Sequence, residues 1–171
     1  MHPNAQLIHN FYTAFQNQNA EEMNSCYHAD IQFSDPAFPN LKGSEVSAMW
    51  GMLTENLKKS GGSWRLEFNN IQADETTGRA HWEAYYTLSS TGNKVHNVIE
   101  ATFFFKDGKI IQHIDAFNFY RWASMAFGVK GVLLGWAPFF QKKVQATVKN
   151  LLIKYMERSK TSKTDKHQPL G

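Results

Sequence analysis

A change in hydrophobic period near Trp64 constrains the fold of this 171-residue chain more than any other feature of its sequence. Upstream, apolar residues recur at three- and four-residue intervals, the spacing of one face of an amphipathic helix. Downstream they alternate, and turn signals at Thr77-Gly78, Thr91-Gly92-Asn93 and Asp107-Gly108 separate four strand-like runs. The sequence therefore predicts an α+β domain, in which N-terminal helices cover one face of a curved antiparallel sheet.

Three helices are expected before the sheet and one at the end of the chain. Asn19, followed three residues later by Glu22, forms a capping-box arrangement for the second helix. Ser44 is the expected N-cap of the third helix, and Gly61-Gly62 ends it. The inner faces of the first, third and terminal helices are expected to be Leu7, Ile8, Phe11, Tyr12 and Phe15; Val46, Met49, Trp50, Leu53 and Leu57; and Val144, Val148, Leu151, Leu152 and Tyr155.

The composition supports a single domain with a substantial core. Hydrophobic residues make up 42% of the chain and aromatic residues 14%. We expect one domain over residues 1–156, with a core at 4–119 and a helical extension at 120–156. The polar segment 157–171 is expected to be a disordered tail.

Charge and cysteine content argue against several functional classes. Residues 157–171 hold four of the 18 basic and two of the 15 acidic residues, which leaves 14 and 13 upstream. This nearly neutral body predicts no nucleic-acid partner. The lone Cys26 fits a reducing compartment, and the N-terminal pattern is not that of a signal peptide, so we expect a cytoplasmic protein.

One carboxylate lies at the end of an apolar strand pattern. Alternation places Ile31, Phe33 and Asp35 on one face, and Pro36 keeps Asp35 extended. Burial would raise the pKa of Asp35 into the range useful to a general base. The alternative interpretation is that Asp-Pro opens a turn, in which the side chain of Asp35 accepts hydrogen bonds from the local backbone.

Two further acids, Glu100 and Asp115, are predicted on apolar faces of other strands, so the three could meet in one pocket with separated pKa values. Alternatively, each is satisfied separately by backbone or by His96 and His113. His113 fits either an acid–imidazole pair with Asp115 or a neutral core histidine bonded to it. No metal site and no cofactor are expected, because the spacings contain no HExxH or comparable ligand set.

Three segments carry a resemblance to a known family: the helix at 7–18, the run from Tyr27 to Pro36, and Phe103 to Ile110. Over residues 4–119 the chain resembles the nuclear transport factor 2-like superfamily. That superfamily includes ketosteroid isomerases, SnoaL-like polyketide cyclases and limonene epoxide hydrolases. The resemblance implies a cone-shaped α+β fold, which hosts many chemistries and many proteins without any.

The resemblance also implies roles for individual residues. Asp35 is similar in position to the isomerase general base, and Tyr12 to the oxyanion-hole tyrosine. Glu100 falls where the isomerases carry a protonated aspartic acid as second oxyanion donor. Asp115, with His113 beside it, resembles the acid–base aspartate of SnoaL-like cyclases. The alternative for Tyr12 is a packed ring whose hydroxyl bonds any nearby acceptor.

These observations predict an isomerase, cyclase or hydratase that acts on an apolar, carbonyl-containing small molecule by carboxylate general-base catalysis. The alternative is a non-catalytic binding protein or a dimeric scaffold of the same fold. Aromatic residues are expected to form core and pocket wall. The predicted ligand-binding residues are Phe33, Trp50, Trp82, Tyr86, Phe104 and Phe117.

A homodimer is expected, because the last two strand-like runs are apolar on both faces and need two covers. For the extension at 120–156 the expected role is a lid or a dimer element. Its lysines are ordinary solvated-face residues, so membrane contact is not expected.

Overall fold

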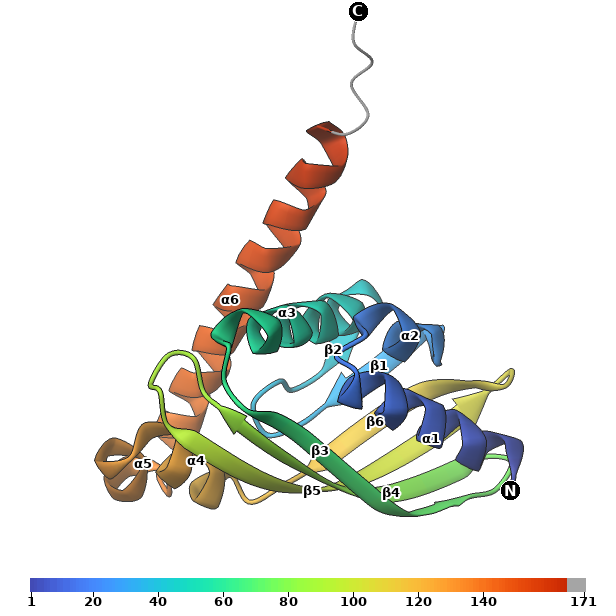
Figure 1. Ribbon diagram of the computed structural model, residues 1–171, viewed down its shortest axis with the longest axis horizontal. Helices are drawn as coiled ribbons and strands as arrows, with labels where there is room; N and C mark the ends of the chain where they lie inside the picture. The colour runs from blue at the N-terminus through green and yellow to red at the C-terminus, as the bar shows by residue number, and fades with distance from the viewer. Residues whose placement is uncertain (166–171) are drawn as a thin grey trace, which may run out of the picture.

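The computed structural model describes residues 1–165 and contains one six-stranded sheet with helices before and after it (Figure 1). The strand order is β2-β1-β6-β5-β4-β3. The helices are α1 (Pro3–Gln16), α2 (Ala20–Ser25), α3 (Ser44–Ser60), α4 (Phe119–Phe127), α5 (Val129–Leu134) and α6 (Pro138–Asp165). The strands are β1 (Tyr27–Ser34), β2 (Leu41–Lys42), β3 (Trp64–Ala73), β4 (Thr77–Thr87), β5 (Lys94–Lys106) and β6 (Lys109–Ala116).

The predicted antiparallel meander is confirmed as β3 to β6, with neighbouring strands paired antiparallel along the chain. The turn between β5 and β6 shows why the sequence signals this hairpin. Lys106 pairs with Lys109, and the two residues between them, Asp107 and Gly108, have positive φ angles of 51° and 71°. A two-residue hairpin of this twist requires such angles, which Asp-Gly adopts readily.

Strand β1 runs parallel to β6, a pairing that joins the first strand of the chain to the last. Phe33 pairs with His113, and Ser34 pairs with Ile114. Asp35 directly follows the last residue of β1, and it lines the same cavity as Asp115. Two carboxylates that lie eighty positions apart in the chain thus meet at one point of the sheet.

Helices α1, α2 and α3 lie on one side of the curved sheet, and α4 to α6 lie at one end (Figure 1). The main core fills the space between α1, α3 and the sheet; Phe11, Phe33 and Phe103 are among its fully buried side chains. Asn19 caps α2 as predicted, by accepting from the backbone N–H of Glu22 at 3.2 Å. Helix α3 begins at Ser44 itself, so the predicted N-cap is one residue too late.

The C-terminal helix is longer than the sequence pattern indicates. Residues 157–165 continue α6, so the predicted disordered tail is wrong there, and residues 166–171 lie outside the described residues. The last turns of this helix are polar, so apolar spacing does not predict them. The absence of glycine and proline from positions 139–165 is consistent with one continuous helix. Within residues 1–165, no helix is long and apolar enough to cross a membrane.

Candidate functional site

A cavity of about 470 Å³ lies between the sheet, α3 and the C-terminal helices. Five of the six predicted ligand-binding residues line it, together with both strand-end carboxylates. These lining residues are Phe33, Trp50, Trp82, Tyr86 and Phe117, with Asp35 and Asp115. Helices α4 and α6 contribute Trp122, Phe140, Val144 and Val148. The extension is therefore a wall of the cavity.

Two predicted site residues, Glu100 and Phe104, lie on the opposite face of β5, so their assignments are wrong. Glu100 Oε1 is 2.6 Å from His81 Nδ1, and the glutamate side chain is 71% exposed. Phe104 is 37% exposed and does not line the cavity. Both faces of β5 are largely apolar in sequence, so the sequence does not show which one faces the cavity. In the structure Ala101 pairs with Asp115 and shares its face, which puts the neighbouring Glu100 on the opposite face.

Asp35 combines the two interpretations that its sequence context leaves open. Its Oδ1 accepts from the backbone N–H groups of Ala37 at 2.7 Å and Phe38 at 2.5 Å, which is the turn geometry. The side chain also lines the cavity. Burial raises the pKa of Asp35 to about 6, against the lowering effect of the Phe38 hydrogen bond, and the neighbouring Asp115 adds to the rise. A carboxyl group with this pKa exchanges protons near neutral pH.

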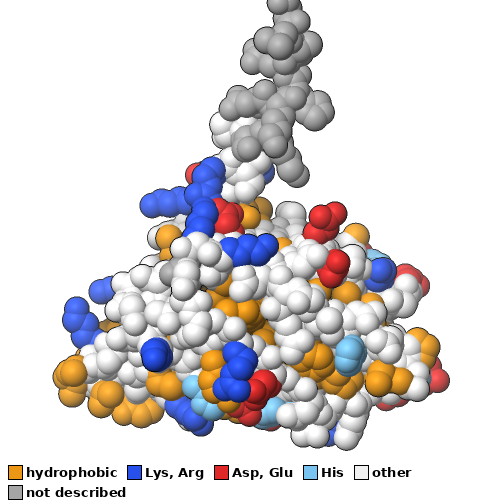
Figure 2. All heavy atoms as spheres, viewed as in Figure 1, with side chains coloured by type: hydrophobic (Ala, Val, Ile, Leu, Met, Phe, Trp, Pro, Cys, Tyr) orange, Lys and Arg blue, Asp and Glu red, His pale blue; other side chains and the backbone are white. Residues whose placement is uncertain are grey.

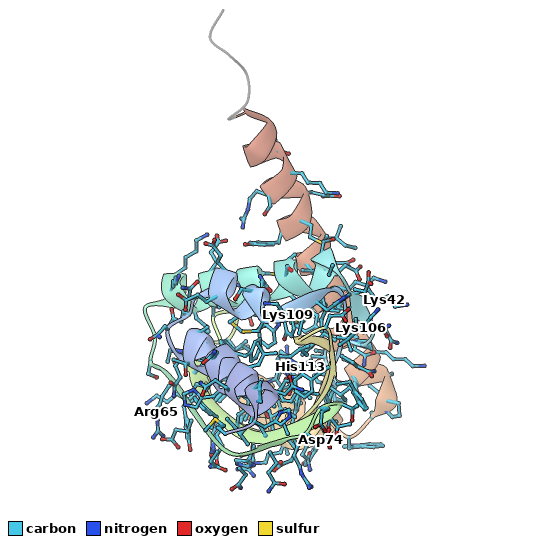
Figure 3. All side chains as sticks on the ribbon, turned by 90° about the vertical axis from the view of Figure 1, so that its right-hand side faces the viewer. Lys42, Arg65, Asp74, Lys106, Lys109 and His113 are labelled. Carbon is cyan, nitrogen blue, oxygen red and sulfur yellow. The ribbon has the colours of Figure 1, made fainter. Side chains whose placement is uncertain are left out.

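Asp115 stands at the end of a chain of buried hydrogen bonds. Its Oδ1 accepts from Trp82 Nε1 at 3.1 Å and lies 3.0 Å from His113 Nε2. His113 Nδ1 lies 2.8 Å from the hydroxyl of Tyr27, which accepts from Trp50 Nε1 at 3.0 Å. Figure 3 shows His113 inside the molecule, among the side chains packed between the sheet and the helices.

Trp50 can only donate, so the Tyr27 hydroxyl accepts from it. The direction of the other bonds depends on the tautomer of His113, and the tautomer protonated at Nε2 lets Tyr27 donate to Nδ1. A neutral imidazole that accepts at Nδ1 carries its proton on Nε2 and donates it to Asp115 Oδ1. Asp115 Oδ2 has no hydrogen-bond donor among the described residues, so this oxygen is available to a ligand.

Tyr12 does not reach the cavity. It is fully buried, its ring stacks on Phe68 at 5.3 Å, and its hydroxyl has no hydrogen-bond partner in the described part of the chain. Burial raises the pKa of this phenol well above its usual value. The packed-ring interpretation holds for Tyr12, although its hydroxyl finds no acceptor.

A second tyrosine, which the sequence identified only as pocket wall, has the features expected of a hydrogen-bond donor in the cavity. Trp122 Nε1 donates to the Tyr86 hydroxyl at 2.9 Å. Among residues 1–165 no acceptor takes the proton of Tyr86, so that proton is free for a ligand in the cavity it lines. Burial raises the pKa of Tyr86 to about 12, which keeps the phenol protonated. Trp122 lies on α4 in the extension, and no local sequence pattern indicates its contact with Tyr86.

Helix α6 also holds the loop that follows Asp35. Gln141 and Gln145, one helical turn apart, both donate through Nε2 to the carbonyl oxygen of Pro36, at 3.0 and 2.9 Å. Residues four apart lie on the same face of a helix, but this spacing does not indicate what that face contacts, so the sequence does not identify the two glutamines as contacts. We call this pair of residues the glutamine clamp.

The site shows no arrangement of metal ligands. No group of three or more His, Cys, Asp or Glu side chains in the described part of the chain is placed to hold a metal ion. Carboxylate, phenol and indole groups line the cavity, together with amide, hydroxyl and lysine side chains such as Asn97, Thr147 and Lys143. These groups suit proton transfer and hydrogen bonding to an organic molecule.

The curved sheet with helices on one face defines an α+β protein of the nuclear transport factor 2-like class. The SnoaL-like domain family model matches residues 8–113, and the chain belongs to this family. Helices α4, α5 and α6 lie beyond the matched residues. The comparison with curated proteins gave no match.

Solved structures share the fold at low sequence identity. An LEH-like epoxide hydrolase from M. tuberculosis is 17% identical with a TM-score of 0.57, and the match covers 78% of this chain and 91% of that one. TerC, crystallised with polyporic acid, is 16% identical with a TM-score of 0.61 and coverages of 74% and 99%. A nuclear transport factor 2-like protein from Burkholderia pseudomallei is 13% identical, with a TM-score of 0.56 and coverages of 69% and 92%. These likenesses concern the fold alone.

Proposed function

We propose that this protein is a cofactor-independent acid–base enzyme, of isomerase, cyclase or hydratase type, acting on an apolar molecule that contains a carbonyl group. The observation that carries the proposal is the juxtaposition of Asp35, with its pKa near 6, and the unused hydroxyl proton of Tyr86 in one apolar cavity. A general base is most effective when its pKa lies near the operating pH.

In the proposed reaction, Asp35 removes a proton from the carbon next to the carbonyl group. The electron pair of the broken C–H bond moves onto the carbonyl oxygen, where the hydroxyl of Tyr86 donates a hydrogen bond. The enolate is then reprotonated at another carbon by Asp35. Alternatively, it attacks a second carbonyl carbon of the same molecule, whose C=O electron pair moves onto the oxygen and takes the proton from Asp35. Asp115, held at Oδ1 by Trp82 and His113, supplies the second carboxyl oxygen facing the substrate.

Deuterium exchange tests this assignment before the natural substrate is known. Apolar bicyclic and aromatic ketones are incubated with the protein in D₂O, and deuterium at the carbon next to the carbonyl is measured by NMR. Asp35→Asn retains the acceptor oxygen of the turn but not the base, so we expect exchange to fall about 10² to 10⁴-fold. Tyr86→Phe is expected to lower it by about 10² to 10³-fold.

The matched control is Asp74→Asn. Asp74 Oδ1 accepts from the backbone of Thr76 at 2.8 Å and Thr77 at 2.7 Å, which is the same turn geometry as at Asp35, but Asp74 does not line the cavity. This variant is expected to exchange at the wild-type rate. Wild-type exchange in Asp35→Asn would remove Asp35 from the role of base.

A binding protein without chemistry is the second candidate function. Tyr12 and Glu100, the two residues predicted to donate hydrogen bonds to the oxyanion, both lie outside the cavity, which favours this function. This function predicts that an apolar ketone binds, and perturbs the fluorescence of Trp82 or Trp122, with no exchange above the solvent rate. Saturable binding with zero catalysed exchange across the ketone panel would favour it over the enzyme.

A further inference from the structure

The end of the molecule formed by α4, α5 and the start of α6 exposes several large apolar side chains. They are Val129, Val132, Leu133, Trp136 and Phe139, with exposed fractions between 49% and 75%. We call these five residues the apolar tip. Figure 2 shows hydrophobic side chains gathered at the lower left of the molecule, where Figure 1 places α4 and α5.

The local sequence explains why these side chains face outward. Gly131 is buried against α4, and a Cβ atom at this position would lie 1.9 Å from the carbonyl oxygen of Ala123. Glycine therefore occupies the side of α5 that packs on the protein, and the larger residues are left on the other side. Trp136 is 73% exposed, and its indole N–H donates to the carbonyl oxygen of Leu133 at 2.9 Å. The indole thus satisfies its polar group internally and presents hydrocarbon to the outside.

The charge around the apolar tip is of one sign. Residues 116–156 contain six basic residues and no acidic residue, whereas residues 1–115 contain eight basic and thirteen acidic residues. Arg121, Lys130, Lys142 and Lys143 in this basic segment are all exposed. A second copy docking on the same surface would bring like charges together, while an anionic surface would attract them.

We propose that the apolar tip docks this protein on an anionic lipid surface, with the five apolar side chains at the level of the headgroups and the basic residues on lipid phosphates. Exposed tryptophan and aliphatic residues flanked by cations are the composition that favours such an interface. The sequence pattern alone favoured a lid or a dimer element, and the exposure of the tip alters that expectation. Phe127 and Phe140, which line the cavity, adjoin the tip in sequence. Docking would therefore bring the cavity close to apolar compounds dissolved in the lipid.

Vesicle sedimentation tests the proposal with phosphatidylcholine vesicles, with and without about 30% phosphatidylglycerol. We expect binding to the anionic vesicles, weakened about tenfold without phosphatidylglycerol and about tenfold between roughly 50 and 300 mM NaCl. The double variant Leu133→Ser with Trp136→Ser is expected to bind about tenfold more weakly. The matched control Ile153→Ser, at an exposed apolar position of α6 outside the tip, is expected to bind as the wild type does.

Charge and fluorescence variants separate the two parts of the interaction. Arg121→Gln with Lys142→Gln is expected to weaken binding to anionic vesicles, while Lys58→Gln with Lys106→Gln, at exposed positions of the body, is expected to leave it unchanged. Trp50, Trp82 and Trp122 are buried, and Trp64 is half-buried on β3, outside the tip, so the blue shift of emission on binding should come mainly from Trp136. Trp136→Phe keeps the apolar surface and should bind while losing most of that shift.

Three results would overturn the proposal. The first is no binding of the wild type to anionic vesicles at low salt. The second is an equal loss of binding in Ile153→Ser and in the tip double variant. The third is self-association of the wild type that the tip double variant abolishes while neither protein binds vesicles, which would make the tip an interface between copies of this chain.

Discussion

At the scale of single residues, Asp35 couples the stability of the fold to pH. Its pKa rises from an ordinary 3.8 to about 6 on folding, so between these values the folded state binds a proton more tightly than the unfolded state. The free energy of unfolding therefore falls as pH rises through this window. Above about pH 7 the wild type has lost all of this part of its free energy of unfolding, because Asp35 is ionised in the folded state. Below the ordinary pKa of an aspartate nothing is lost.

Asp35→Asn should remove this loss of stability. We expect the variant to be more stable than the wild type at pH 7 to 8, by up to about 3 kcal/mol, with the difference disappearing below about pH 4. Urea unfolding at several pH values measures this.

Asp74→Asn should be less stable than the wild type at neutral pH, because turn hydrogen bonds from Thr77 and Thr76 lower the pKa of Asp74 to about 2. The stability that these bonds supply is lost as pH falls, so the difference should shrink at low pH. A variant Asp35→Asn that is less stable at pH 8 would contradict the raised pKa.

Tyr27 is the centre of the buried hydrogen-bond chain, since its hydroxyl accepts from Trp50 and is hydrogen-bonded to His113 Nδ1 at 2.8 Å. Tyr27→Phe leaves both partners without their hydrogen bond in a fully packed region, at a cost of about 1 to 3 kcal/mol for each buried group. Tyr85→Phe is the matched control, because Tyr85 donates to Glu83, which keeps its contacts with His81 and His96. Thermal unfolding should show a much larger loss in Tyr27→Phe than in the control; equal losses would mean that the chain contributes little.

Asp35 could be placed because β1 has one polar face, whereas Asp115 was placed correctly on a run that is apolar on both faces. The alternation in β1 put Asp35 on the apolar side, and the short His113-Ile114-Asp115 run did the same for Asp115. The predicted placement of Glu100 in the pocket was wrong. Both faces of β5 are largely apolar in sequence, so alternation does not indicate which face is inside. The free proton of Tyr86 depends on Trp122, a residue of another element, and no local pattern reveals such a contact.

At the scale of elements, the glutamine clamp ties α6 to the loop that carries Asp35. Gln141→Leu with Gln145→Leu retains the size of the side chains but leaves the Pro36 carbonyl oxygen without its two donors. We expect the loop to loosen, water to reach Asp35, and the pKa of Asp35 to move from about 6 toward its ordinary value. Carboxyl NMR of selectively labelled aspartate follows this directly.

The control for the clamp is Gln6→Leu with Asn10→Leu, a pair one turn apart on the exposed face of α1 whose side chains bond only to each other at 2.9 Å. It should leave the titration of Asp35 unchanged. An unaltered Asp35 pKa in the clamp variant would show that α6 covers the loop without holding it.

Individual elements could be predicted where their signal is local. The Asp107-Gly108 hairpin and the Asn19 cap depend on a few neighbouring residues, and both occur in the structure. The parallel pairing of β1 with β6 depends on contacts between distant parts of the chain, and nothing in either strand indicates its partner. The site lies at that pairing. A common pocket for Asp35 and Asp115 was predicted from the sequence, but the strand pairing that forms it was not.

At the scale of the whole molecule, one face of the sheet has no helix packed on it in the described part of the chain. Helices α1, α2 and α3 lie on the other side (Figure 1). The alternation of buried and exposed residues in β5 and β6 places Val98, Phe104 and Ile114 on the open face. The predicted homodimer through this face stays a prediction. Light scattering at micromolar concentration should give the mass of two chains.

A charge-introducing variant tests which face is used. Phe104→Lys with Ile114→Lys would place like charges opposite one another across a two-fold axis, and should give the mass of one chain. Leu133→Ser with Trp136→Ser, at the apolar tip, is the control and should keep the wild-type mass. A wild-type chain that scatters as a monomer would contradict the dimer.

The glutamine clamp has a consequence for selectivity. Because α6 is both a wall of the cavity and the support of the Asp35 loop, a guest molecule too wide for the cavity pushes outward on the same helix that restrains the acid. Oversized molecules would then enter, yet meet a weakened base. The size of the bound molecule would then affect the turnover rate more than the affinity. Substitutions on α6 that do not contact the bound molecule would change this size limit.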